Sequence, residues 1–247
     1  MKMTTRIRRY GTVILVLFAV GITLAAGGCA VRRVKLNVRR DKRVVKLRGV
    51  ESVKAKIVMK AGELTIDDGG KSLLAADFTC SMDSWKPRVD YDVHGKTGKL
   101  TIRGPKQVSS FFQSRTINHW DLRINNDIPL ELSVKSNLGD SNLQLGDLNL
   151  YNFKLSSSAG DAKLDLDGDW NHDVDVDINT SMGDLLLRLP KDFGVRVEID
   201  AGLSDISAPG FKIEDGGYEN DAYADAKNKL DIRVKHQAGD ITLEMVD

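Results

Sequence analysis

The side chains of this sequence with the most obvious chemical potential are acidic and lie close together. Seven aspartates fall within seventeen residues: Asp161, Asp165, Asp167, Asp169, Asp173, Asp175 and Asp177. Calcium prefers six to eight oxygen ligands, and the run that starts at Asp165 begins like a calcium loop. An EF-type loop requires glycine at its sixth position and glutamate at its twelfth, whereas this chain has Trp170 and Val176 there. Solvent-facing strand residues and an Asp-Gly turn therefore explain the run, and we predict no metal site.

Other groups that support catalysis in proteins are scattered along the chain. His94, His119, His172 and His236 stand singly in polar surroundings, which is typical of surface or turn residues rather than of metal ligands or general bases. The sequence also lacks a Gly-x-Ser-x-Gly elbow, a His-Glu-x-x-His motif and a phosphate-binding glycine loop. We therefore expect no catalytic residues, no cofactor and no small-molecule substrate, and a protein that is not an enzyme.

One short motif, a glycine followed by an acid, recurs along the chain and organises it. It occurs at Gly62-Glu63, Gly139-Asp140, Gly160-Asp161, Gly183-Asp184 and Gly239-Asp240, with a looser form in Gly202-Leu203-Ser204-Asp205. From Asp140 onward the acids are 21, 23, 21 and 35 residues apart, and a period in this range marks a stacked repeat. Glycine allows a positive φ and aspartate accepts backbone N–H bonds, so we interpret the motif as a corner that fixes a turn.

Stacking these corners in register would place their carboxylates about 5 Å apart, and like charges at that spacing repel. Two solutions are open: the turns stagger and solvate the carboxylates, or a cation bridges some of them. We favour the first.

Alternating apolar and polar residues flank each corner. One strand enters the corner, as in Val174–Ile178, and a second leaves it, as in Leu185–Leu189. Stacked coils of two strands and two turns place equivalent strands side by side and parallel, with apolar side chains inside. The predicted fold is all-β: a β-solenoid of two-strand coils of about 21 residues, covering residues 50–247. An antiparallel β-sandwich built from the same hairpins is the alternative.

Two segments interrupt the pattern. Residues 106–118 are irregular and contain Phe111-Phe112, which fit either a partner contact or a loop whose rings pack onto the body. An insertion at residues 208–226 lengthens the interval before Asp240, and it serves binding or covers an exposed end of the stack. Cys80 alternates with its neighbours in Asp77–Ser81, which predicts a small core or half-buried side chain rather than a reactive or dimer-forming thiol.

The N-terminal residues indicate export. Residues 1–28 combine four basic side chains with an apolar run at Thr12–Ala26, the layout of a signal peptide. Gly27-Gly28 before Cys29 resembles the lipobox of bacterial lipoproteins, which implies cleavage before Cys29 and a diacylglyceryl group on its thiol. The match departs from the usual pattern because Ala26 stands where leucine is customary. An uncleaved signal anchor is the alternative, and both interpretations place a membrane-attached body outside the cytoplasm.

Charge is segregated along the 247-residue chain, although the formal net charge is only +1. Residues 30–48 hold nine basic and one acidic side chain, and residues 49–247 hold 23 basic against 34 acidic ones. The basic neck, residues 29–49, either lies on anionic lipid headgroups or forms an exposed first strand or tether. Export and an acidic body argue against nucleic acid as a partner.

Residues from about 50 to 247 resemble a known family. Trp120–Leu130, Gly62-Glu63-Leu64, Asp77-Phe78, Pro87 and the recurrent corners are similar to the toast-rack domain of bacterial cell-envelope proteins. That domain is related to the C-terminal domains of cell-wall stress-response regulators and to adhesin-like proteins. The resemblance implies architecture and compartment more directly than activity.

These observations predict a non-enzymatic, lipid-anchored cell-envelope protein whose β-solenoid presents a surface to another envelope protein. The resemblance implies a role in sensing or regulating envelope stress. The alternative function is an adhesin-like surface or glycan-binding module. The expected partners are the membrane, through diacylglyceryl Cys29 and the basic neck, and an envelope protein.

Overall fold

The alternation of apolar and polar residues produces strands throughout the body of the protein. The computed structural model describes residues 38–105 and 116–246, which belong to one compact unit, Leu36–Asp247. Along β12 (Val174–Met182), for example, Val174, Val176 and Ile178 are buried and the residues between them face outward. Among the described residues the one helix is the single 3-10 turn η1 (Asp83–Trp85), and no helix there has the length and apolar character needed to cross a membrane.

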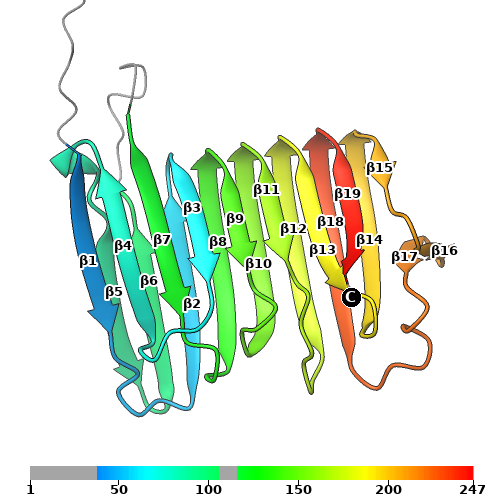
Figure 1. The fold of residues 1–247 in the computed structure, drawn as a ribbon, viewed down its shortest axis with the longest axis horizontal. Helices are drawn as coiled ribbons and strands as arrows, with labels where there is room; N and C mark the ends of the chain where they lie inside the picture. Colours follow the sequence, from blue (N-terminus) through cyan, green and yellow to red (C-terminus); the bar gives the residue numbers. More distant parts are fainter. Residues whose placement is uncertain (1–37, 106–115, 247) are drawn as a thin grey trace, which may run out of the picture. The chain divides into compact units, whose positions relative to one another are not determined.

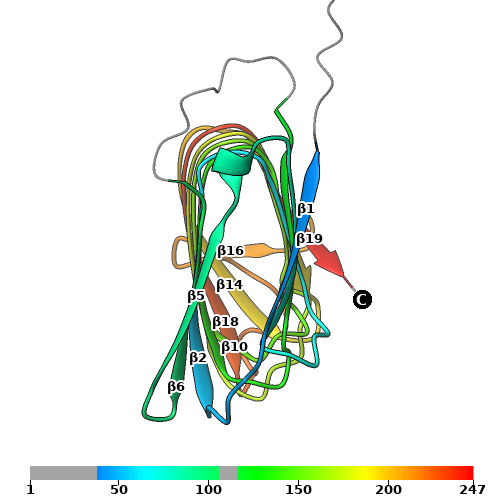
Figure 2. The ribbon, with the colours of Figure 1, turned by 90° about the vertical axis from the view of Figure 1, so that its left-hand side faces the viewer.

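The strands form two sheets that face one another (Figures 1 and 2). The first sheet has nine strands in the spatial order β1 (Arg39–Val45), β4 (Leu74–Cys80), β7 (Asn118–Ile124), β3 (Glu63–Asp67), β9 (Ser141–Gln144), β11 (Ala162–Asp165), β13 (Leu185–Pro190), β19 (Ile241–Val246) and β15 (Ile206–Ser207). The second sheet has ten, in the order β16 (Lys212–Glu214), β17 (Gly217–Glu219), β14 (Gly194–Leu203), β18 (Lys229–Ala238), β12, β10 (Leu150–Ala159), β8 (Leu130–Leu138), β2 (Ser52–Met59), β6 (Thr97–Arg103) and β5 (Arg88–His94).

Each Gly-acid corner carries the chain from the second sheet to the first. The pairs β8–β9, β10–β11 and β12–β13 are successive coils, and their strands run parallel in register, so that Leu155 lies beside Ile178 and Leu164 beside Leu187. Among the described strands, antiparallel pairing is confined to the two ends of the stack, as in β1–β4 and β14–β17. The parallel stack confirms the predicted β-solenoid over the antiparallel β-sandwich.

The spatial order of the coils differs from their order in the sequence. The coil β18–β19 lies between β12–β13 and the end coil β14–β15. At the other end, β2–β3 lies between β6–β7 and β8–β9. The long interval between Asp205 and Asp240 therefore has a simple origin, because the chain completes the end coil first and then returns to fill the place next to it.

Segments outside the regular repeat cover both ends of the stack. Residues 208–226 contribute β16 and β17, and β17 pairs with β14, so this insertion covers the edge of the second sheet. At the opposite end, β1 pairs with β4. Residues 39–45 of the basic neck thus form a first strand, as one of the two interpretations expected, and the sheet begins before residue 50. Arg40 and Lys42 are exposed on this edge strand, where charge opposes pairing with another sheet.

A single continuous core of apolar side chains fills the space between the two sheets. Its largest members include Phe78 and Trp120, whose rings meet edge to face with centroids 5.5 Å apart. Burial of one such side chain contributes about 1.5–3 kcal/mol. Cys80 is 1% exposed and packs with Ala61 and Trp85 in a smaller cluster, which confirms a core side chain. Burial raises the pKa of its thiol.

Candidate functional site

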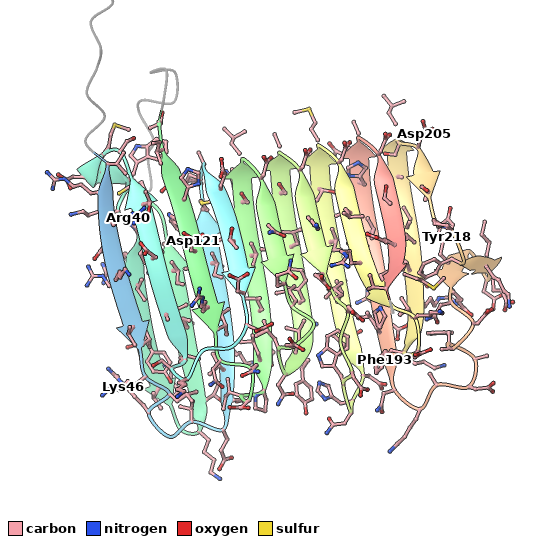
Figure 3. The ribbon with its side chains drawn as sticks, in the orientation of Figure 1. Arg40, Lys46, Asp121, Phe193, Asp205 and Tyr218 are labelled. Atoms are coloured by element: carbon pink, nitrogen blue, oxygen red, sulfur yellow. The ribbon has the colours of Figure 1, made fainter. Side chains whose placement is uncertain are left out.

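The Gly-acid corners lie above one another along one edge of the stack, called here the corner edge, where Figure 3 labels Asp205. At Gly139, Gly160 and Gly183 the φ angles are +112°, +121° and +116°. A Cβ atom at any of these residues would overlap the backbone carbonyl of the corner glycine in the neighbouring coil. Each of these positions therefore requires glycine for two reasons: the conformation of the turn and the close contact between coils.

The corner aspartates link successive coils. Oδ1 of Asp140 accepts the backbone N–H of Asp161 at 2.9 Å, and Oδ1 of Asp161 accepts that of Asp184 at 2.9 Å. Oδ1 of Asp184 in turn accepts the N–H of Asp240 at 3.0 Å. The expected bond between an aspartate and a backbone N–H is thus present, but it joins neighbouring corners instead of closing one turn. All four residues are also exposed to solvent, and each bond to an ionised acceptor offsets part of the repulsion.

The acidic run from Asp161 to Asp177 does not converge on one point. Asp177 lies 2.9 Å from Arg233 and 3.3 Å from Lys154, both on neighbouring strands. Asp165 is 8% exposed and binds Arg188 of the next coil at 2.6 Å, so its assignment to a solvent-facing position is wrong. Within the described part of the chain, no group of three or more His, Cys, Asp or Glu residues is placed to hold a metal ion.

The four histidines also lie apart, and one of them is not where the sequence predicts. His94 is exposed on β5, and His119 pairs with Glu63 at 2.8 Å. His236 is only 2% exposed, with Nε2 3.1 Å from the carbonyl of Gly239 and Nδ1 2.6 Å from the hydroxyl of Thr180. A carbonyl can only accept, so Nε2 carries the proton and, in the neutral ring, Thr180 donates to Nδ1. His236 supports a corner from inside and is not a surface residue.

A polar groove lies at the opposite edge of the stack, called here the groove edge. Three turns form it: the one before β8, the one between β9 and β10, and the one between β11 and β12. The cavity has a volume of about 360 Å³ and is lined by Asn126, Asp127, Gly146, Asp147, Leu148, Asn149, Asp169, Trp170, Asn171 and His172. No sequence motif marks this group, because its members come from three polar turns that look like ordinary loops.

Close packing and a hydrogen bond fix two of these turns, the ones before β10 and β12, against one another. A Cβ atom at Gly146 would overlap the carbonyl of Asp167, and one at Gly168 would overlap the carbonyl of Gly146. The indole N–H of Trp170 donates to the carbonyl of Leu148 at 2.8 Å. The groove therefore has a preformed floor.

His172, which lines the groove, stacks on a second ring, that of Tyr151. Tyr151 and His172 are nearly parallel, with an interplanar angle of 8° and centroids 3.7 Å apart. His172 Nε2 is 3.0 Å from the carbonyl of Leu150, so this nitrogen carries a proton, and Nδ1 lies 2.9 Å from the side-chain amide of Asn171. In the neutral ring, that amide must present its NH₂ group to Nδ1. Tyr151 remains 44% exposed.

A second hollow lies on the outer face of the first sheet near β1, where Figure 3 labels Asp121. Its volume is about 390 Å³, and Asp77 and Asp121 lie opposite one another across an antiparallel pair. Lys42 Nζ is 3.7 Å from Asp77. Both acids and bases line this hollow, and no aromatic ring is among its lining residues, so the groove is the stronger candidate site. Cys29, Phe111 and Phe112 lie outside the described residues.

Comparison with known proteins defines the family. Residues 34–188 match the family described as the N-terminal domain of toast_rack, DUF2154. The match covers more than half of the sequence, and the chain belongs to this family. A crystal structure of a "putative cell adhesion protein" from Clostridium sporogenes is 26% identical with a TM-score of 0.82, and the alignment covers 85% of this chain and 100% of that chain.

Two further crystal structures are more distant. A "putative adhesin" from Bacteroides fragilis is 12% identical with a TM-score of 0.30, covering 83% of this chain and 96% of that one. A second "putative adhesin", from Parabacteroides merdae, is 13% identical with a TM-score of 0.28, and the alignment covers 85% of this chain and 96% of that one. TM-scores this low do not indicate a common fold. No match was found among curated proteins.

Proposed function

We propose that this protein is an adhesin-like protein of the bacterial cell surface that acts by binding and is held to a membrane through Cys29. The observation that carries the proposal is the alignment with the whole length of the Clostridium sporogenes protein, which is described as a "putative cell adhesion protein". This comparison favours the second of the two functions expected from the sequence. A role in envelope stress, which the resemblance alone implied, stays a prediction.

The architecture supports a binding role. A stack of coils in register is a rigid platform that displays its turns along two edges. At the groove edge, the titratable residues lining the cavity are three aspartates and His172, and both ring nitrogens of His172 are already engaged. His172 therefore has no free nitrogen for proton transfer, and we assign a binding role to this edge.

The position of β1 also suits an anchored surface protein. Arg39, near the start of the described chain, pairs with Cys80 on β4, and Cys80 pairs in turn with Asn118 on β7. The side chain of Asn118 donates a hydrogen bond to the carbonyl of Ala61, next to the first corner. The described chain therefore begins at the corner edge. The groove is at the other edge, away from Arg39.

Surface display and adhesion can be tested together in cells. Added protease should cleave the body of the protein in intact cells, and deletion of the gene should reduce attachment to host or matrix surfaces. Cys29→Ala should lose the mass of the lipid and leave the membrane fraction. A body fully protected from protease, together with unchanged attachment of the deletion strain, would contradict the proposal. An unchanged membrane fraction and mass for Cys29→Ala would contradict the anchor alone.

A further inference from the structure

The geometry of the groove edge points to a specific class of ligand: we propose that this groove binds a neutral saccharide. The proposal rests on the adhesin-like function above and assigns that function to one site. Three properties of the groove carry it: the chemistry of its polar groups, its electrostatic field and the ring pair that begins at the lining residue His172.

The polar groups suit hydroxyl recognition. Asp127, Asp147 and Asp169 are exposed around the cavity, and an ionised carboxylate only accepts hydrogen bonds. Asn171 is exposed as well and adds an amide that both donates and accepts. A sugar hydroxyl donates once and accepts twice, so a ring with several hydroxyls can satisfy such a mixed set.

The electrostatic field excludes anionic ligands. The three aspartates line the cavity without a lysine or arginine among the lining residues. Burial, followed by the hydrogen bond and negative charge of Asp147, raises the pKa of the adjacent Asp68. Phosphorylated or carboxylated glycans would be repelled here, whereas a neutral saccharide would not.

The ring pair that begins at the lining residue His172 supplies the apolar contact that a sugar ring needs. Tyr151 is held flat against His172 at 3.7 Å and is still 44% exposed, so part of its ring is open to solvent. His172 is itself fixed by the Leu150 carbonyl. An aromatic ring with a wet edge offers apolar area at little entropic cost, and one face of a pyranose carries mainly C–H groups.

The size of the groove limits the ligand to a short segment of glycan. A volume of about 360 Å³ is at the lower end of the range for small-molecule sites. The floor is preformed by Gly146 and Gly168, so binding requires little rearrangement of the backbone.

Full-length protein in detergent micelles should be tested on an array of neutral and anionic oligosaccharides, followed by calorimetry with the best neutral one. We expect binding to neutral members only, and at least tenfold weaker binding for Tyr151→Ala and for Asn171→Ala. Asn179→Ala is the matched control, because Asn179 is exposed on β12 far along the strand from the groove. Thermal unfolding should show that the variants keep the fold.

Two results would overturn the proposal: no neutral oligosaccharide binds the wild-type protein, or both groove variants bind as the wild type does. Attachment assays separate this failure from failure of the proposed function. If Tyr151→Ala and Asn171→Ala restore attachment to a deletion strain, the groove assignment is wrong and the adhesin-like function stands. If the deletion strain attaches normally, the adhesin-like function fails whatever the groove binds.

Discussion

At the corner edge, the carboxylates of Asp140, Asp161 and Asp184 each accept a hydrogen bond from the next coil, whereas at the groove edge the aspartates crowd one another. Burial and the Asp147 carboxylate raise the pKa of Asp68. Burial and the Asp165 carboxylate raise that of Asp167, against the opposing charge of Arg188. Aspartate thus stabilises the fold at the corner edge and destabilises it at the groove edge.

The difference follows from how regular the two edges are. At the corner edge every coil repeats one turn, so a backbone N–H recurs at strand spacing and each aspartate finds the same donor. At the groove edge the turns differ in length and sequence, so their side chains are not all used by neighbouring coils. Regular turns hold the stack together, and irregular turns leave groups free for a ligand.

The largest effect is expected from Gly160→Ala at the corner edge. The new Cβ would overlap the backbone carbonyl of Gly139, and φ is +121°, so we expect a loss of about 4 kcal/mol in the free energy of unfolding. Gly95→Ala is the control, because φ there is +61° but no atom lies within 4 Å of the added Cβ. It should cost about 1 kcal/mol. Equal losses in urea unfolding would show that contact between corners is not the source.

Thr180→Val should have the next largest effect, because it removes the donor to the buried Nδ1 of His236. An unsatisfied buried acceptor costs about 2 kcal/mol. Ser157→Ala is the matched control, since Ser157 is the register partner of Thr180 on β10 and is also buried. It should cost less than about 1 kcal/mol. Similar midpoints of urea unfolding for the two variants would argue against a structural role for His236.

Asp161→Ala should destabilise the protein by about 1 kcal/mol, because the N–H of Asp184 loses its acceptor. Asp161→Asn keeps an acceptor oxygen and should cost less than about 0.5 kcal/mol. At the groove edge, Asp169→Ala should change stability by no more than about 0.5 kcal/mol. Denaturant unfolding of the three variants tests the contrast directly, and a larger loss for Asp169→Ala than for Asp161→Ala would reverse it.

The smallest effect is a gain of stability at the groove edge. The pKa of Asp68 is raised in the folded state. The contribution of this group to the free energy of unfolding is therefore fully present below its ordinary pKa, and it is lost as the pH rises through the folded-state pKa. Asp68→Asn should therefore stabilise the protein by about 0.5 kcal/mol at neutral pH. The gain should shrink as the pH falls toward about 4. Unfolding free energies across this range measure it, and a gain independent of pH would rule out the charge as its cause.

Much of the fold could be predicted from local patterns. Gly139-Asp140 and its repeats marked the corners, strict alternation marked the strands, and Cys80 was correctly assigned to the core. The same alternation places His236 inward with Ile232 and Val234. The prediction instead relied on the polar neighbours Lys235 and Gln237, which favoured a surface position. Asp165 was misassigned because its burial depends on Arg188, 23 residues away on the next coil.

The groove could not be predicted in this way. Its residues lie in segments around 126–127, 146–149 and 169–172, and each segment taken alone is a polar turn. Only the stacking of coils brings them to one place. The stacked Tyr151 and His172 rings depend on the same register, because the two residues belong to successive coils.

The sequence by itself determined the single coil: two alternating strands joined at a corner that only glycine and an acceptor side chain can form. Tertiary structure decided which coils are neighbours. The edge of a coil offers the same row of N–H and C=O groups whichever coil pairs with it. The local pattern therefore cannot specify that β18–β19 lies between β12–β13 and the end coil β14–β15. That choice depends on core packing and on the end cover supplied by β16 and β17, which act only when the whole stack is assembled.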